Sequence, residues 1–408
     1  MATTEESIRT SDADEARVHE LIRQLLDEHP PGSTDEQEFW GAQFDLGLAF
    51  VHFPEGRGGL GLSPKLQTVV TRELRAAKAP QANMLRNVIG LGMGAPTVLA
   101  HGTEEQQDRW LRPLFTCEEV WCQLFSEPGA GSDVAGLATR AVRDGDEWIV
   151  NGQKVWTTLA HTAKWGMLVA RTDPDVPKHR GMTYFVVDME AEGVEVRPLR
   201  QITGEAEFNE VYFTDARVPD AQRLAGEGEG WNVAITTLMN ERTALGSDGS
   251  ERRGAGPTGL ALKLWKEYEP NDPVLRDELM RMWVESEVLR FTAMRASGNR
   301  KAGTPGPEGS VGKLFYAEHN QRVRNVCMKI MGADALLYPE GGYEMRRPGE
   351  ASYDAGGDPR KAFLRSRANT IEGGTSEIMR NILGERVLGL PGEPRNDKDV
   401  PWAEVPRS

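Results

Sequence analysis

A run of small and polar residues at 123–133 has the composition of a ligand-binding loop. It reads Gln-Leu-Phe-Ser-Glu-Pro-Gly-Ala-Gly-Ser-Asp. The closely spaced Gly129 and Gly131 allow backbone N–H groups to approach an anionic or planar ligand, and the hydroxyls of Ser126 and Ser132 can donate hydrogen bonds to it. Glycine-rich loops are common, so these residues alone leave an ordinary turn as an alternative.

A second segment, at 151–158, reads Asn-Gly-Gln-Lys-Val-Trp-Thr-Thr. We expect a turn in it to place Trp156 and Thr158 on one side of a strand, because they are two residues apart. A tryptophan face beside a hydroxyl suits a flavin, whose ring is flat and apolar but whose N5 and carbonyl edges need hydrogen bonds. Taken alone, Trp156 would be better explained as a core residue.

Together the two segments resemble motifs of the acyl-CoA dehydrogenase family of flavoenzymes. Residues 126–133 match the family pattern (Thr/Ser)-Glu-Pro-Gly-Ala-Gly-Ser-Asp, and residues 151–158 match Asn-Gly-x-Lys-x-Trp-(Ile/Thr)-Thr. A third motif, Gly-Gly-Thr-x-Glu-Ile, is present at 373–378. The three motifs occur in the family's order, and the helix–β–helix arrangement covers nearly the whole chain.

The resemblance implies FAD bound without a covalent link. Ser126 and Thr158 would hydrogen-bond the isoalloxazine ring, Trp156 would pack on it, and Ser132 would lie close to flavin and thioester. The cofactor contacts implied are Leu124, Ser126, Gly131, Ser132, Trp156, Thr158, Thr375 and Glu377, and the substrate contacts are Ser132 and Arg242. Thr375 and Glu377 match positions that contact the FAD of the same or a neighbouring subunit.

The reaction implied is α,β-dehydrogenation of an acyl-CoA to the trans-2-enoyl-CoA, as in lipid and fatty-acid degradation. A base removes the α-proton while the β-hydride passes to the flavin, and an electron-transfer flavoprotein then accepts the electrons. The α-proton is too weakly acidic for a free carboxylate at neutral pH. The site must therefore stabilise the enolate-like oxygen in a desolvated pocket that also raises the pKa of the base.

Two glutamates are candidates for that base. Many family members carry it directly before the Gly-Thr of the third motif, but an ungapped alignment places Gly373 there, and Glu372 lies one residue earlier. Other members use a Glu-Arg pair in an early helix of the C-terminal domain, present here as Glu241 and Arg242. We expect Glu241 to be the base, with Glu372 as the alternative. An exposed, purely structural Glu-Arg pair is the other interpretation of Glu241.

Two segments depart from the family pattern that holds the adenine end of FAD, at 298–310 and 329–334. This departure leaves two alternatives: the adenine end of FAD is held differently, or FAD is shared with a related chain. We expect a homotetramer or dimer of dimers, with a heteromer as an alternative. A non-catalytic or FAD-sharing subunit, and a flavin monooxygenase or oxidase on the same scaffold, stay open as functions. The length, branching or ring content of the acyl group is not determined.

The helix and strand patterns around these motifs predict an α+β protein. Ser63-Pro64 and Thr103 are typical helix starts, while Asp144-Gly145 and Asn151-Gly152 are typical turns between short strands. The expected parts are an N-terminal α-helical domain at 1–120, a middle antiparallel β domain at 121–220, a C-terminal four-helix bundle at 221–392 and a polar tail at 393–408.

The C-terminal part is predicted to contain helices at 274–297, 311–332 and 361–388. The first should carry an apolar stripe, made of Leu275, Leu279, Met282, Trp283, Val288, Leu289, Phe291 and Met294. A polar, glycine-rich segment at 338–359 separates the last two helices and is assigned no role.

Composition excludes several classes of protein. The 408 residues carry 48 Lys and Arg against 62 Asp and Glu, a net charge of −14, which argues against a general nucleic-acid binder. No run of 18 apolar residues occurs and the start is acidic, so we expect no integral membrane segment and a cytoplasmic protein. The odd number of cysteines without Cys-x-x-Cys spacing predicts buried thiols, and the scattered histidines predict no metal site.

Overall fold

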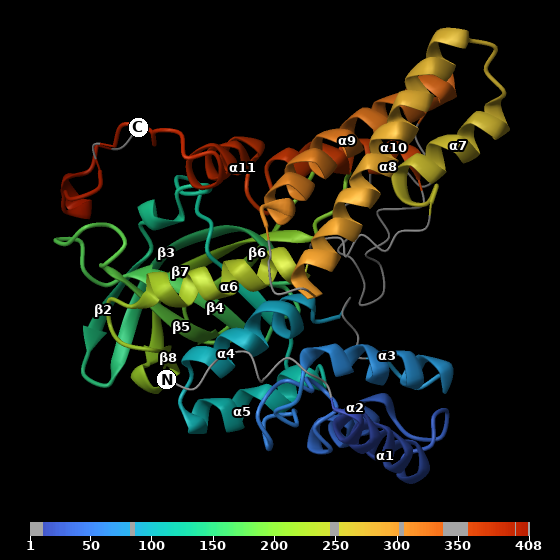
Figure 1. The fold of residues 1–408 in the computed structure, drawn as a ribbon. Coiled ribbons are helices and arrows are strands. Elements are labelled where there is room, and N and C mark those ends of the chain that lie inside the picture. The colour runs from blue at the N-terminus through green and yellow to red at the C-terminus, as the bar shows by residue number, and fades with distance from the viewer. Residues whose placement is uncertain are drawn as a thin grey trace.

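The computed structural model describes residues 11–81, 86–244, 253–301, 306–337, 358–395 and 397–406. An N-terminal group of helices, a middle β-sheet and a C-terminal group of long helices follow one another along the chain, as predicted (Figure 1). Most of the polar segment expected at 338–359 lies outside the described residues.

The N-terminal helices start where their capping residues predict. Ser63 accepts a hydrogen bond from the Lys65 N–H at 3.4 Å at the start of a 3-10 turn, and Thr103 accepts one from the Gln106 N–H at 3.3 Å. The helices are α1 (Asp12–Glu28), α2 (Glu36–Asp45), α3 (Gln67–Ala76), α4 (Ala95–His101) and α5 (Glu104–Phe115).

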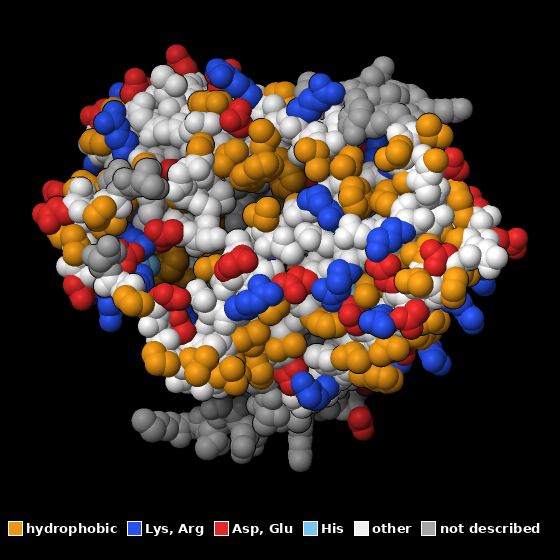
Figure 2. All heavy atoms as spheres, turned by 90° about the horizontal axis from the view of Figure 1, so that it is seen from above, with side chains coloured by type: hydrophobic (Ala, Val, Ile, Leu, Met, Phe, Trp, Pro, Cys, Tyr) orange, Lys and Arg blue, Asp and Glu red, His pale blue; other side chains and the backbone are white. Residues whose placement is uncertain are grey.

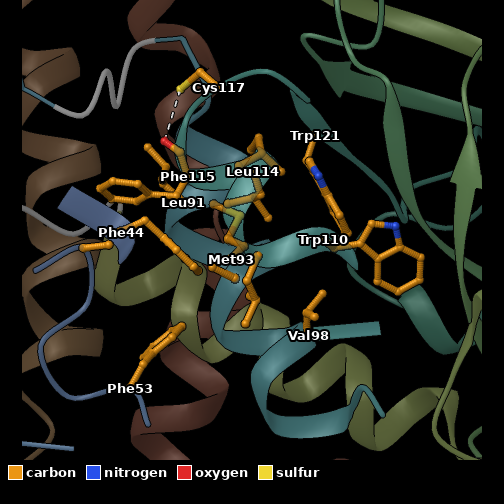
Figure 3. Close-up of a cluster of buried hydrophobic side chains, with 14 of the residues drawn as sticks. Phe44, Phe53, Leu91, Met93, Val98, Trp110, Leu114, Phe115, Cys117 and Trp121 are labelled. Carbon is orange, nitrogen blue, oxygen red and sulfur yellow. Dashed lines mark hydrogen bonds between the residues drawn. The ribbon is translucent and has the colours of Figure 1, made fainter. Parts of the chain in front are cut away.

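Aromatic side chains fill the core that these helices share with the first strand of the sheet. Trp110 meets Trp121 edge to face, with ring centroids 5.8 Å apart, and both side chains are buried (Figure 3). Such an arrangement places the positive edge of one ring against the negative face of the other. The thiols of Cys117, Cys122 and Cys327 are buried, as predicted.

The middle sheet is mixed rather than purely antiparallel. Its strands are β1 (Trp121–Leu124), β2 (Arg140–Asp144), β3 (Glu147–Thr158), β4 (Trp165–Arg171), β5 (Met182–Asp188), β6 (Val194–Leu199), β7 (Phe208–Pro219) and β8 (Arg223–Leu224). Strand β1 pairs in parallel with β4, and β2 makes a single parallel contact with β4. A tight hairpin cannot join parallel strands, and here the loop at 125–139 together with β2 and β3 separates β1 from β4.

One of the two predicted turns is a bulge. Asp144-Gly145 does turn the chain from β2 into β3, whereas Asn151 and Gly152 lie inside the continuous strand β3. The pairing with β7 shifts register there, and Gly152 has a φ of +154°. A Cβ at Gly152 would lie 2.7 Å from the Thr139 Cα, so glycine is required by close packing.

The C-terminal helices are α6 (Gly230–Ala244), α7 (Gly256–Tyr268), α8 (Pro273–Lys301), α9 (Glu308–Met331), α10 (Pro359–Arg365) and α11 (Ser376–Asn381). Helices α7, α8 and α9 share one core, whereas α6 packs on the middle sheet. The prediction of a single helix at 361–388 is wrong. The chain forms two separate helices, α10 and α11, and between them Gly373 and Gly374 have φ values of +61° and +93°.

The apolar stripe of α8 is buried at one end only. Leu275, Leu279 and Met282 lie in the core, but Val288, Phe291 and Met294 are 53–56% exposed in the single chain. In the described part of the chain, no helix combines the length and the apolar character needed to cross a membrane.

Candidate functional site

A buried ion pair joins the glycine-rich loop to strand β3. The Lys154 ammonium donates to the Glu127 carboxylate at 2.8 Å and to the Phe125 carbonyl at 3.0 Å, and the Lys154 side chain is fully buried. The same carboxylate accepts the Ala138 N–H at 2.6 Å and the Thr139 N–H at 2.9 Å. Both ends of the loop are therefore tied to one carboxylate.

These contacts decide the charge state of Glu127. Burial raises the pKa of the Glu127 carboxyl, but the charge of Lys154 and the hydrogen bonds from Lys154, Thr139 and Ala138 outweigh burial and hold that pKa below its usual value. The carboxylate is thus ionised at neutral pH and serves as a structural anchor rather than as an acid or base.

The outer part of the loop is open. A Cβ built on Gly129 or on Gly131 meets no atom within 4 Å, and Ser132 is exposed. Ser126 is half-buried, and its carbonyl accepts the Val155 N–H at 2.9 Å. The side chain of Leu124 is fully buried in the core, so only its main chain could touch a ligand.

Trp156 is turned out of the sheet. A second register shift of β3 falls between Lys154 and Thr157, and Trp156 has a φ of +61°, a conformation that costs energy for a bulky residue. Its side chain is 57% exposed, Thr157 is buried and Thr158 is half-buried. This exposure excludes core packing as the role of Trp156.

These features fit a flavin. The Val155–Ser126 hydrogen bond ties the strand segment that carries the exposed indole to the loop that carries the Ser126 hydroxyl and the two open glycines. A flat ring with polar edges needs such a surface. Strain is stored at functional sites when the surrounding structure enforces it, and the bulge at Trp156 is such a place.

Helix α6 brings Glu241 to the root of the loop. The Thr237 hydroxyl lies 3.1 Å from the Tyr184 hydroxyl on β5 and 3.0 Å from the Thr97 hydroxyl on α4, and Thr237 is buried. Glu241 follows one helical turn later on the same face. Gln123 on β1 donates to its carboxylate at 3.5 Å, and Glu241 is partly buried. The side chain of the predicted substrate contact Arg242 lies outside the described residues.

The alternative base, Glu372, is engaged elsewhere. Arg365 donates to both of its oxygens at 3.1 and 2.9 Å, and Asn369 donates at 2.7 Å. Arg365 also donates to Glu207 at 3.0 Å. Arg365 and Asn369 thus occupy both oxygens of the Glu372 carboxylate, and no described hydrogen bond joins it to the loop at 126–133.

Arg365, which binds Glu372 directly before the third motif, reaches Trp156 of the second motif through an aromatic contact. The Arg365 guanidinium lies 5.7 Å from the Phe208 ring, and Phe208 meets Trp156 edge to face with centroids 5.7 Å apart. Thr375 caps α11 by accepting the Ile378 N–H at 3.1 Å, and the Glu377 side chain is 78% exposed. No described contact joins Thr375 or Glu377 to the loop at 126–133.

Sequence reasoning missed the residues that hold the site together, namely Glu127, Lys154 and Thr237. Lys154 did carry a signal, because it lies in a predicted strand, where a buried charge without a partner is costly. Thr237 carried none, since a threonine inside a helix is ordinary.

Three family models match successive parts of the chain. The model described as acyl-CoA dehydrogenase, N-terminal domain, matches residues 6–118, the middle-domain model matches 122–216 and the C-terminal-domain model matches 228–388. The order of these matches is the order of helices, sheet and helices in the structure.

Curated relatives and solved structures agree with the family models. Acyl-CoA dehydrogenase IpdE1 of Mycobacterium tuberculosis is 38% identical over 88% of this chain and 89% of that protein. Acyl-CoA dehydrogenase FadE34 of the same organism is 40% identical over 85% of this chain and 45% of that protein.

Among solved structures, the Tcur3481-Tcur3483 steroid ACAD has a TM-score of 0.67 at 25% identity, covering 95% of this chain and 100% of that one. The ChsE4-ChsE5 complex of Mycobacterium tuberculosis has a TM-score of 0.66 at 28% identity, with the same two coverages.

Proposed function

This chain belongs to the acyl-CoA dehydrogenase family of flavin-dependent oxidoreductases, and from that premise we propose that it dehydrogenates an acyl-CoA thioester to the trans-2-enoyl-CoA with Glu241 as the base. The observation that carries the proposal is the contact between Glu241 and Gln123, which sets a carboxylate at the root of the glycine-rich loop. The engagement of Glu372 by Arg365 supports the same assignment.

Each group of residues then has a task. The Glu241 carboxylate takes the α-proton of the thioester, and a bound flavin would supply the acceptor for the β-hydride. Trp156 offers a face for the flavin ring, while Ser126 and Thr158 offer hydroxyls for its edges. The Glu241 carboxylate is oriented by Gln123 and, one turn earlier in the helix, by the buried contacts of Thr237. Proton abstraction requires such positioning of the base first of all.

We propose FAD as the flavin, with an electron-transfer flavoprotein as the acceptor of its electrons. Thr375 and Glu377 lie on the C-terminal side without a described contact to the loop. This placement supports a role in holding FAD across an interface with another subunit.

The exposed end of the α8 stripe supports an oligomer. Val284, Val288, Phe291 and Met294 follow one face of the helix and are 53–59% exposed. Figure 2 shows hydrophobic side chains gathered in patches on the face of the molecule seen from above. Apolar surface of this kind favours burial against another chain. The partner is a second copy or, as the ChsE4-ChsE5 complex suggests by analogy, a related chain.

Anaerobic mixing of the purified protein with a panel of acyl-CoAs tests the reaction and its substrate. The panel should vary in chain length, branching and ring content, and should include a steroid thioester, since one similar structure is described as a steroid ACAD. Loss of the oxidised-flavin absorbance and formation of enoyl-CoA are expected for one class. Flavin that no thioester bleaches, even with a related chain added, would contradict the proposal.

A further inference from the structure

The C-terminal segment leaves the helices and lies against the middle sheet. After α11, the chain runs away from the long helices toward the β domain (Figure 1), where Trp402 and Ala403 contact the connection between β4 and β5. The Trp402 N–H donates to the Val176 carbonyl and the Ala403 N–H to the Pro174 carbonyl, both at 2.9 Å. Residues 397–406 are thus held to this connection by main-chain hydrogen bonds and are not a solvated tail.

Trp402 contacts the residues just after the glycine-rich loop, directly and through Arg171. Its indole N–H donates to the Gly136 carbonyl at 3.3 Å, and its ring lies 4.7 Å from the Arg171 guanidinium carbon. Arg171 is 3% exposed and donates at 2.6 Å both to the Ala135 carbonyl and to the Lys178 carbonyl. The indole therefore covers the arginine that fixes the end of the loop.

Asp397 is connected to Asp133 of the loop through Lys178. The buried Lys178 ammonium lies 2.5 Å from the Asp397 carboxylate and donates to both oxygens of Asp133 at 2.8 Å. Asp133 directly follows Ser132, the exposed hydroxyl of the loop. Since Lys178 is 5% exposed, removing one of its carboxylates leaves a buried charge with a single counter-charge.

We propose that the C-terminal segment is a clamp that sets the position of the flavin and thioester loop, with Asp397 and Trp402 as positioning residues. The two anchors act at the two ends of the stretch 133–136: Asp397 acts through Lys178 on Asp133, and Trp402 acts on Gly136 and, through Arg171, on Ala135. The catalytic consequence rests on the proposed function, because it assumes that Ser132 faces cofactor and thioester. The mechanical consequence does not rest on it.

Hydrogen–deuterium exchange of the full-length protein tests the mechanical part. Asp397→Asn and Trp402→Ala should each speed exchange in the peptide covering residues 128–137 by about tenfold, because the first loses an ion pair with Lys178 and the second loses the hydrogen bond to Gly136 together with the ring over Arg171. The matched control for the charge is Asp399→Asn, which makes the same change at an exposed neighbour and should exchange within about twofold of wild type. Trp402→Phe keeps a ring over Arg171 but loses the indole N–H, so its exchange should lie between wild type and Trp402→Ala.

Steady-state kinetics with the acyl-CoA found in the bleaching panel tests the catalytic part. Asp397→Asn should raise KM about tenfold and leave kcat within about threefold, because the loop is displaced while Glu241 is not. Unchanged loop exchange in both variants, or a lowered melting temperature without faster loop exchange, overturns the clamp. If wild type reacts with no thioester, the proposed function fails, and faster loop exchange in the variants still supports the clamp.

Discussion

Lys154, a fully buried lysine of β3, points its ammonium at Glu127 of the glycine-rich loop, 2.8 Å away. One residue belongs to each of the two sequence motifs, so the motifs are a single unit of structure. Two residues after Lys154, the strand turns Trp156 into solvent. The pair thus fixes the geometry of the loop relative to the exposed indole.

Replacing Glu127 by Gln should strongly destabilise the protein. The amide keeps the volume but leaves the Lys154 ammonium buried without a counter-charge, a change that typically costs about 3–5 kcal/mol. Urea unfolding measures the effect. Glu195→Gln, which breaks an exposed pair with Arg197, is the control and should leave the unfolding midpoint in place. Equal midpoints for the two variants would refute the role given to the buried pair.

Replacing Trp156 by Ala should weaken flavin binding about tenfold, since an aromatic face and its contact area are lost. The fold should survive, because the side chain is 57% exposed. Flavin occupancy after dialysis measures the effect. Trp156→Phe retains a smaller ring, so its flavin occupancy should lie between those of wild type and Trp156→Ala. Full occupancy in Trp156→Ala would count against stacking.

The clamp predicts a pH dependence. The hydrogen bond from Lys178, opposed by burial and aided by Arg395, lowers the pKa of Asp397 to about 2. In the unfolded chain that pKa is about 3.9. A carboxyl whose pKa is depressed by folding stabilises the protein above its unfolded pKa and loses this contribution as the pH falls through its folded value.

Wild type should therefore be more stable than Asp397→Asn by about 1–2 kcal/mol at pH 6, and this difference should shrink between about pH 4 and pH 2. Urea unfolding of both proteins across that range measures it. A difference that is constant with pH would show that the Asp397 charge does not hold the clamp.

The part of this molecule that could be predicted from sequence is the part encoded locally. Thr103 and Ser63 cap helices because their hydroxyls serve N–H groups two or three residues away, and Asp144-Gly145 turns a hairpin for a similarly local reason. The family and the flavin followed from three short motifs. Each of these signals lies within a few residues of the chain.

The remainder depends on contacts between distant residues. Asn151-Gly152 looks like a turn, but pairing with β7 keeps it inside a strand, and packing against Thr139 explains the glycine. Lys178 pairs with Asp133, which lies 45 residues earlier in the chain, and with Asp397, which lies near the C-terminus. The polar composition of the last residues gave no sign that they lie against the sheet, because the contacts depend on a few side chains and on the main chain.

The most direct test of the account is anaerobic mixing of an acyl-CoA substrate with wild type, Glu241→Gln and Glu372→Gln, followed at the oxidised-flavin band at roughly 450 nm. We predict rapid bleaching in wild type and, within about tenfold, in Glu372→Gln. Glu241→Gln should keep its flavin and bleach at least about 1000-fold more slowly, because its amide cannot take the α-proton. Bleaching of Glu241→Gln at the wild-type rate, with Glu372→Gln inactive, would contradict the central claim and assign the base to Glu372.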